Sequence, residues 1–357
     1  MGQGIRRAWT VYYPIEETLK RHLRRVRQEA NIRVIFRTTV EGEEFLRYEG
    51  EDMMIFAAEE DLRFLASCRH WFGDGTFKVV PTGYGQQYTL HGFHDGMTYP
   101  CVYALLKGKS ELDYNKFLDE IWELFPNDVV PNPVSIMTDF ELAAINSFRN
   151  KFPNAEVSGC YFHLGQSAWR KIQNIGNGLP QKYRSDRSFA LRVKKFLALA
   201  FVPPNEVRDY MQLILEDEAS RGDGLLEEFA VYFQRMYVGQ QHLRERFDRA
   251  SWNMYERIKN NLPRTNNSLE GFHSAFSKTI QDHPPITVLS SKYRKVQHKK
   301  GNVREQHLDG RSKPTIRKKY EKVNKSLLDQ VSRFDRNQIE NLVYLEQIAK
   351  STTINTN

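Results

Sequence analysis

The stretch HWFGDGTFKVV, residues 70–80, marks a change of period in the sequence. Its aromatic and branched residues predict an extended strand, and the turn residues at 81–83 end that strand. Two further extended runs follow at 87–93 and 99–106. Together the three runs predict an antiparallel meander, from which the rest of the fold can be worked out.

Helices and short strands alternate after the meander. The expected elements are a helix at 111–125, a strand at 134–138, a helix at 140–152, a strand at 155–160 and a helix at 164–175. This order predicts an α/β fold with a mixed five-stranded sheet and helices on its faces. Residues 188–257 have a helical pattern without strand signals, which predicts an all-α insertion. A further helix begins near Asn267.

The flanking parts of the chain are less regular. Residues 15–28 and 51–68 are expected to be helical, and beyond Asp282 we expect helix only in patches. The expected regions are an N-terminal helical and basic region (1–68), the first part of the α/β core (69–176), the all-α insertion (177–262), the last helix of the core (263–285) and a basic C-terminal tail (286–357).

The composition of the 357 residues excludes several classes of protein. With 40% apolar residues the chain can bury a substantial core, in one large domain or two ordinary ones. No apolar run approaches the roughly 20 residues of a membrane span, and no apolar leader is present. Three widely spaced cysteines argue against a disulfide framework and predict a reducing compartment.

Positive charge is concentrated in one segment. Residues 292–325 contain thirteen Lys and Arg against three Asp and Glu, a net charge of +10. Since the whole chain carries +8, the remainder carries −2. This asymmetry favours an anionic partner, most simply a nucleic-acid backbone. A solvated tail is the alternative explanation.

Three carboxylates fall at defined places in the predicted fold. Asp74 lies within the first strand, Asp139 at the end of the fourth strand, and Glu270 in the first turn of the late helix. These positions can meet at one edge of the sheet, where their oxygens would hold two magnesium ions. Two metals about 4 Å apart activate the attacking oxygen and stabilise the leaving oxygen at a phosphodiester. The pattern therefore predicts a two-metal nuclease.

Each carboxylate also has a purely structural explanation. Asp74 precedes a glycine and could occupy a turn. Asp139 could cap the helix that follows it, and Glu270 could complete a capping box begun by Asn267. The coincidence of all three in this order of strands and helices favours the metal site.

Eight short motifs carry a family resemblance. They are WFGDGTF (71–77), LHG (90–92), YPCVYALL (99–106), MTDFE (137–141), GCYFH (159–163), ALAFVP (198–203), PRTNN (263–267) and EGFH (270–273). In this order they resemble Mutator-like element (MULE) transposases, a eukaryotic branch of the ribonuclease H-like DDE transposase superfamily. The resemblance covers roughly residues 50 to 285.

The resemblance implies a cut-and-paste DNA transposase. Asp74, Asp139 and Glu270 would be its catalytic residues and would bind two Mg²⁺ or Mn²⁺ ions. In such enzymes water attacks the phosphodiester at the element's end, and the freed 3′ hydroxyl then attacks target DNA. The implied partners are the element's terminal inverted repeats, target DNA and further copies of the chain. The implied location is the nucleus.

The GCYFH motif contains Cys160 and His163, which could supply half of a zinc site. His273 or His283 would have to complete that site. The alternative is a packing role for the pair, which we favour because no second ligand pair has a matching spacing.

Contacts to DNA are expected from the basic segment and from two residues near the insertion. The candidates are Arg264, Trp252, Lys292, Arg294, Lys295, Lys299 and Lys300. Trp252 could stack on a flipped base, although a core role is also expected for it. Many relatives carry an N-terminal zinc finger, which three scattered cysteines cannot build; this puts autonomous transposition in doubt.

Two other functions fit the same pattern. A domesticated, catalytically silent transcription regulator would keep the fold and bind DNA without needing the acidic trio. A metal-dependent nuclease or resolvase acting on RNA or branched DNA would keep the trio but has no need of the long helical insertion. The intact trio and the insertion together favour the transposase.

Overall fold

Seven strands form one mixed sheet in the computed structural model, which describes residues 36–240, 242–265, 267–311 and 318–352. The strands are β1 (Leu46–Glu49), β2 (Met53–Phe56), β3 (His70–Thr76), β4 (Gln86–His94), β5 (Met97–Leu106), β6 (Ser135–Thr138) and β7 (Glu156–Gly159). They lie in the order β1-β2-β5-β4-β3-β6-β7. β3, β4 and β5 pair antiparallel, which confirms the predicted meander, and β6 runs parallel to β3 and β7.

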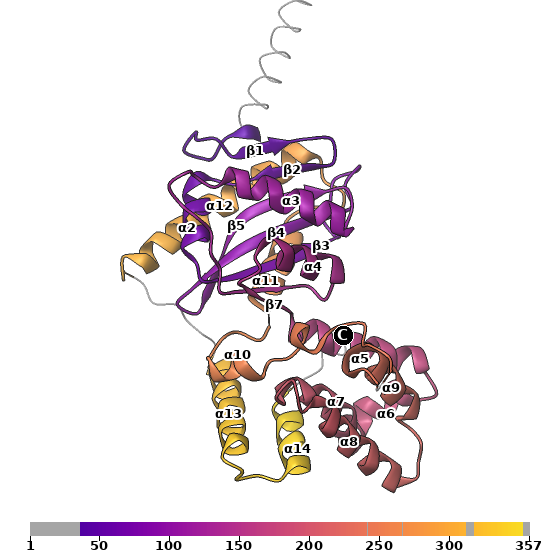
Figure 1. Ribbon diagram of the computed structural model, residues 1–357. Coiled ribbons are helices and arrows are strands. Elements are labelled where there is room, and N and C mark those ends of the chain that lie inside the picture. The colour runs from indigo at the N-terminus through magenta and orange to yellow at the C-terminus, as the bar shows by residue number, and fades with distance from the viewer. Residues whose placement is uncertain (1–35, 241, 266, 312–317, 353–357) are drawn as a thin grey trace, which may run out of the picture.

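Helices cover both faces of this sheet (Figure 1). They are α2 (Glu59–Ser67), α3 (Glu111–Leu124), α4 (Leu142–Lys151), α11 (Asn267–Ser277) and α12 (Ile286–Leu308). Trp71 and Tyr88 point to the face covered by α2, α3 and α4, here named the α3 face. Because side chains alternate along a strand, Phe72 points the other way and packs with Leu269 of α11. This second side is named the α11 face.

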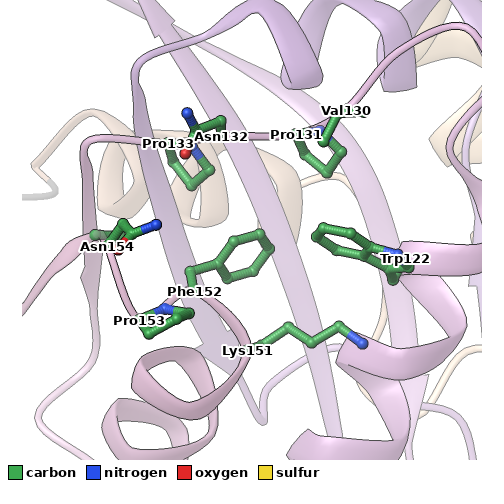
Figure 2. Close-up of a pocket in the computed structure, with 10 residues that line it drawn as sticks. Trp122, Val130, Pro131, Asn132, Pro133, Lys151, Phe152, Pro153 and Asn154 are labelled. Carbon is green, nitrogen blue, oxygen red and sulfur yellow. The ribbon is translucent and has the colours of Figure 1, made fainter.

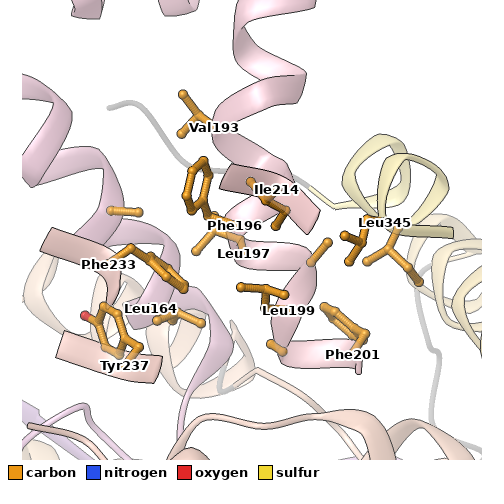
Figure 3. Packing of buried hydrophobic residues seen from close by; sticks show 14 of the residues in the cluster. Leu164, Val193, Phe196, Leu197, Leu199, Phe201, Ile214, Phe233, Tyr237 and Leu345 are labelled. Atoms are coloured by element: carbon orange, nitrogen blue, oxygen red, sulfur yellow. The ribbon is translucent and has the colours of Figure 1, made fainter. Parts of the chain in front are cut away.

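A helical lobe adjoins the sheet (Figure 1). It contains α5 (Tyr161–Ile175), α6 (Leu179–Ser185), α7 (Arg187–Ala198), α8 (Val207–Arg221), α9 (Glu227–Phe233), α10 (Tyr255–Lys259), α13 (Lys318–Asp335) and α14 (Asn341–Ser351). Phe196, Ile214 and Leu345 come from three of these helices and pack in one apolar cluster (Figure 3). Trp252 is fully buried in the same cluster, where its indole N–H donates to the carbonyl of Tyr237 at 3.0 Å.

The sheet has two more strands than the five that were predicted. The expected helix at 51–68 is wrong in its first part, because Met53–Phe56 forms β2 and the helix begins only at Glu59. β2 is buried on both sides and pairs antiparallel with β5. A short run of consecutive apolar residues fits a buried strand and a buried helix equally well, so its pattern did not distinguish them.

The expected C-terminal tail is folded in its described parts. α12 packs on the sheet through Leu289 and Tyr293, and the Tyr103 and Tyr293 rings stack 4.6 Å apart. α13 and α14 contribute Leu327 and Leu345 to the core of the helical lobe. Residues spaced three and four apart form the buried side of α12, and they include Gln297 and Arg304 as well as Leu289 and Tyr293.

Two further expectations concern an N-terminal helix and the absence of a membrane span. The predicted helix at 15–28 lies outside the described residues. No helix in the described part of the chain combines the length and the apolar character that a membrane crossing requires.

Candidate functional site

Asp74 is positioned by the middle of β3. It pairs with Thr89 of β4, so it belongs to a regular ladder and not to a turn. Its side chain is buried on the α11 face, two residues after Phe72. Gly73 is needed for packing on the opposite face, because a Cβ there would lie 3.0 Å from Cζ of Tyr88.

Asp139 directly follows β6, the parallel neighbour of β3. The backbone N–H of Gly75 donates to Oδ2 of Asp139 at 2.9 Å, which ties the ends of the two strands together. The capping explanation is wrong for this residue, because α4 begins at Leu142 and its N-cap is Glu141. Adjacent parallel strands therefore bring the first two acids of the predicted trio together.

His163 joins the two acids from the first turn of α5. One ligand atom from each of Asp74, Asp139 and His163 can be chosen so that all three lie within 4.8 Å of one another. Nδ1 of His163 lies 3.4 Å from Oδ1 of Asp139, and both atoms are buried without a hydrogen-bond partner. β7 runs beside β6, so the helix after β7 starts beside Asp139. Sequence reasoning placed His163 with Cys160 and missed this pairing.

Glu270, the third predicted acid, lies in the first turn of α11. Its side chain is not among the described ones, so its role stays a prediction. One turn further along the same helix, Nε2 of His273 lies 3.2 Å from Oδ2 of Asp74. α11 therefore does bring a polar side chain to the acids of the sheet.

His273 is part of a buried polar chain behind Asp74. Its Nε2 is also 3.2 Å from Oγ1 of Thr89, which in turn is 3.2 Å from Nε2 of His91. Burial lowers the pKa of His273 to about 4, although the charge of Asp139 opposes this shift. The imidazole is then neutral near pH 7, and an Nε2–H tautomer would donate to the Asp74 carboxylate.

Asp74, His163 and His273 border a pocket of about 270 Å³. Its lining includes Asp74, Thr76, Lys78, Phe162, His163, Gln166, His273, Ser274 and Ser277. A larger pocket of about 480 Å³ lies between Trp122, Pro133 and Phe152 (Figure 2). Pro133 precedes β6 whereas Asp139 follows it, so the two pockets lie toward opposite ends of this strand. The larger one contains a single ionisable side chain, Lys151, and offers no acid cluster.

The zinc interpretation of Cys160 and His163 is not supported. Cys160 is buried in an apolar cluster with Phe72, Met137 and Leu269. Within the described residues, the group with metal-ligand spacing contains His163 but not Cys160. His283 instead lies with Nδ1 3.1 Å from the carbonyl of Val80.

Some of the predicted DNA contacts are buried or bonded within the protein, and the others are lysines of α12. Trp252 is wrong as a stacking residue because it has no exposed surface. Arg264 donates to the side chain of Asn324, and Arg294 donates to the carbonyl of Thr39 at 2.6 Å. The remaining candidates are lysines of α12, with Lys295 and Lys299 exposed and Lys292 and Lys300 partly buried. Burial lowers the pKa of Lys300.

Two strand-borne acids with a histidine, gathered at the end of a mixed sheet, define a candidate divalent-metal site in an α/β protein. Residues 70–167, which carry all three side chains, match the family model of the MULE transposase domain. This part of the chain is therefore similar to MULE transposase domains, which supports a transposase-related function at a coarse level. A comparison with curated proteins gave no significant match.

Proposed function

We propose that this protein is the catalytic core of a DDE-type DNA transposase, which cuts DNA at the ends of an element and joins them to a target. The observation that carries the proposal is the gathering of Asp74, Asp139 and His163 inside a MULE transposase domain. A ribonuclease H-like core agrees with the arrangement of five strands, in which an antiparallel meander is followed by two parallel strands. Asp74 lies within the first of these strands, and Asp139 directly follows the fourth.

The side chains present fit divalent cations. Oδ1 of Asp139 and Nδ1 of His163 are buried polar atoms without hydrogen bonds, and such atoms are costly unless a ligand satisfies them. Carboxylate oxygens are the preferred ligands of Mg²⁺ and Mn²⁺. We infer that Asp74, Asp139 and Glu270 hold the ions, with Glu270 supplied by the first turn of α11. When bound, the ions supply Lewis-acid activation of the attacking oxygen and charge stabilisation of the leaving oxygen.

The surrounding residues fix the acids in place. The N–H of Gly75 occupies Oδ2 of Asp139, which leaves Oδ1 directed toward His163. Nε2 of His273 on α11 lies 3.2 Å from Oδ2 of Asp74, on the other side of the site. Such partners orient ligands before the substrate arrives, which is how a rigid site lowers the cost of reorganisation.

DNA is the substrate that this chemistry and the charge distribution favour. Lys292, Lys295 and Lys299 recur at intervals of three and four along α12, so they lie on one side of the helix. The buried residues of α12, including Leu289 and Tyr293, lie on the opposite side. We propose that these lysines, here named the α12 lysines, contact the phosphate backbone. Action in the nucleus and self-association of the chain are parts of the same proposal.

A cleavage assay tests the proposed function. The full chain is incubated with Mn²⁺ or Mg²⁺ and DNA that carries the inverted repeats flanking its own gene. We expect metal-dependent cuts at the repeat ends with wild-type protein and with Asp119→Asn, and no cuts with Asp139→Asn. Asp119 is an exposed matched control, because it loses the same charge and pairs with Lys151 at the surface. Folded protein that binds this DNA without cutting it would favour the silent transcription regulator instead.

A further inference from the structure

His163 occupies an unusual position for a histidine beside a carboxylate. Nδ1 of His163 and Oδ1 of Asp139 face each other at 3.4 Å, yet the geometry is not that of a hydrogen bond, and among the described residues neither atom has a hydrogen-bond partner. Both atoms are buried although the side chains of His163 and Asp139 are 24% and 18% exposed, and His163 lines the pocket. A contact between two unsatisfied polar atoms at this depth needs a third group to compensate for their desolvation.

The helix around His163 holds the imidazole in this position. Tyr161 and Leu164 are buried in the core of the helical lobe on either side of it. The backbone N–H of Tyr161 donates to the carbonyl of Arg264 at 3.1 Å, which fixes the start of α5. The backbone position of His163 is therefore set by packing, which is one part of what a preorganised ligand requires.

The separation of the two atoms suits two ligands of one cation. Ligand atoms about 2.1 Å from an octahedral ion lie roughly 3 Å apart along an edge, close to the distance seen here. Asp74 offers a third ligand atom within the same 4.8 Å group. A shared cation would satisfy the orphaned atoms of His163 and Asp139 at once.

We propose that Nδ1 of His163 is a direct ligand of the cation site formed with Asp74 and Asp139, and that this nitrogen makes the site prefer Mn²⁺ over Mg²⁺. Mg²⁺ favours an all-oxygen shell, whereas imidazole binds first-row transition metals well. The inference rests on the proposed function only in taking the acids as a cation site; it names a nitrogen ligand and a metal preference that the acidic trio does not imply.

Electron spin-echo spectroscopy of bound Mn²⁺ tests this assignment without measuring catalysis. The full chain is loaded with Mn²⁺, and the ¹⁴N modulation from a coordinated imidazole is recorded. We expect this modulation in wild-type protein and its loss in His163→Gln. His94→Gln is the matched control, because its Nε2 lies 3.5 Å from a carboxylate oxygen of Asp95 in an exposed histidine–acid pair. This control should keep the modulation.

Measurements of Mn²⁺ and Mg²⁺ affinity test the proposed metal preference. We expect His163→Gln to weaken Mn²⁺ binding about tenfold or more and Mg²⁺ binding less, which narrows the ratio of the two affinities. His163→Asp should shift that ratio further toward Mg²⁺, because it restores an oxygen ligand. Each variant is compared with wild type by thermal unfolding, so that a loss of fold is separated from a loss of ligand.

The possible results separate this inference from the proposed function. Bound Mn²⁺ without ¹⁴N modulation, or modulation that persists in His163→Gln because His273 supplies it, would overturn the inference even if DNA is cut. Modulation that depends on His163 would support it even if DNA is never cut. Absence of any specific Mn²⁺ binding would overturn both.

Discussion

Around Asp74, the two faces of β3 and β4 differ in character. On the α3 face, Trp71 and Tyr88 are sealed beneath helices by apolar contacts, and the hydroxyl of Tyr88 meets Thr138 at 2.7 Å. On the α11 face, the alternate residues include Asp74, Thr89 and His91, all buried and all polar. Burying polar groups costs free energy that burying apolar ones does not. The polar cluster beside Asp74 on the α11 face is therefore retained at some cost in stability because of its chemistry.

The largest expected effect comes from the polar side of this comparison. Asp74→Asn keeps the shape of the side chain but removes its charge, so DNA cleavage should fall by at least about 10³-fold while the thermal midpoint stays the same or rises. Tyr88→Phe, one strand away on the α3 face, should lose about 1 kcal/mol of stability with little change in cleavage. Cleavage rates at saturating metal and thermal unfolding measure the two effects. Equal losses of activity in both variants would contradict the comparison.

A buried ion pair links helices associated with the two faces. Arg304 of α12 donates to the Asp61 carboxylate of α2, and both side chains are nearly inaccessible to solvent. Arg304→Met leaves Asp61 buried and unpaired, so we expect a loss of about 3–5 kcal/mol in the free energy of unfolding. Chemical denaturation measures this loss. A change below about 1 kcal/mol would show that Asp61 finds another partner.

The same variant should also show a pH dependence of known sign. Burial raises the pKa of Asp61 from its ordinary 3.8 to about 7 in the folded protein, and Arg304 opposes this rise. A raised carboxyl pKa means that the folded state binds more protons than the unfolded one between these values. The stability that protonated Asp61 contributes is then lost as pH rises through this window. Above it Asp61 is ionised, and the charge of Arg304 is what stabilises the buried carboxylate. Arg304→Met should therefore lose more stability at pH 8 than at pH 5.

Gly73 tests how tightly the α3 face is packed. A Cβ at this position meets the ring of Tyr88, and that ring is fully buried. Gly73→Ala should therefore lower the free energy of unfolding by about 1–3 kcal/mol through overpacking. Gly271→Ala is the matched control, because a Cβ there meets no atom within 4 Å. Equal stability of the two variants would show that the ring of Tyr88 can move aside at little cost.

The smallest effect is expected at the surface of α12. Replacing the α12 lysines by Gln should weaken DNA binding and lower the slope of log affinity against log salt by about 0.9 for each phosphate that the protein no longer neutralises. The variant should still bind Mn²⁺ as wild type does, because no α12 lysine lines the pocket beside the acids. An unchanged salt slope would remove α12 from the DNA interface.

Local patterns in the sequence were enough to place the acids. The strand at His70–Thr76 and the short strand before Asp139 each have a clear pattern and clear turn signals, so two adjacent carboxylates could be predicted from them. The addition of His163 depends on β7 lying beside β6, a pairing between segments that no local pattern encodes. The two extra strands and the packed C-terminal helices were missed for the same reason, since burial by distant partners overrides local propensity.

Iron-mediated cleavage of the backbone tests most directly whether Asp74 and Asp139 bind divalent cations on the α11 face. Fe²⁺ substituted into the site, with ascorbate and peroxide, generates hydroxyl radicals that cut the nearby polypeptide backbone. We expect fragments that end near residues 74, 139 and 163, competed away by Mn²⁺ and absent from Asp139→Asn. Fragments that end elsewhere, or that persist unchanged in Asp139→Asn, would contradict the claim.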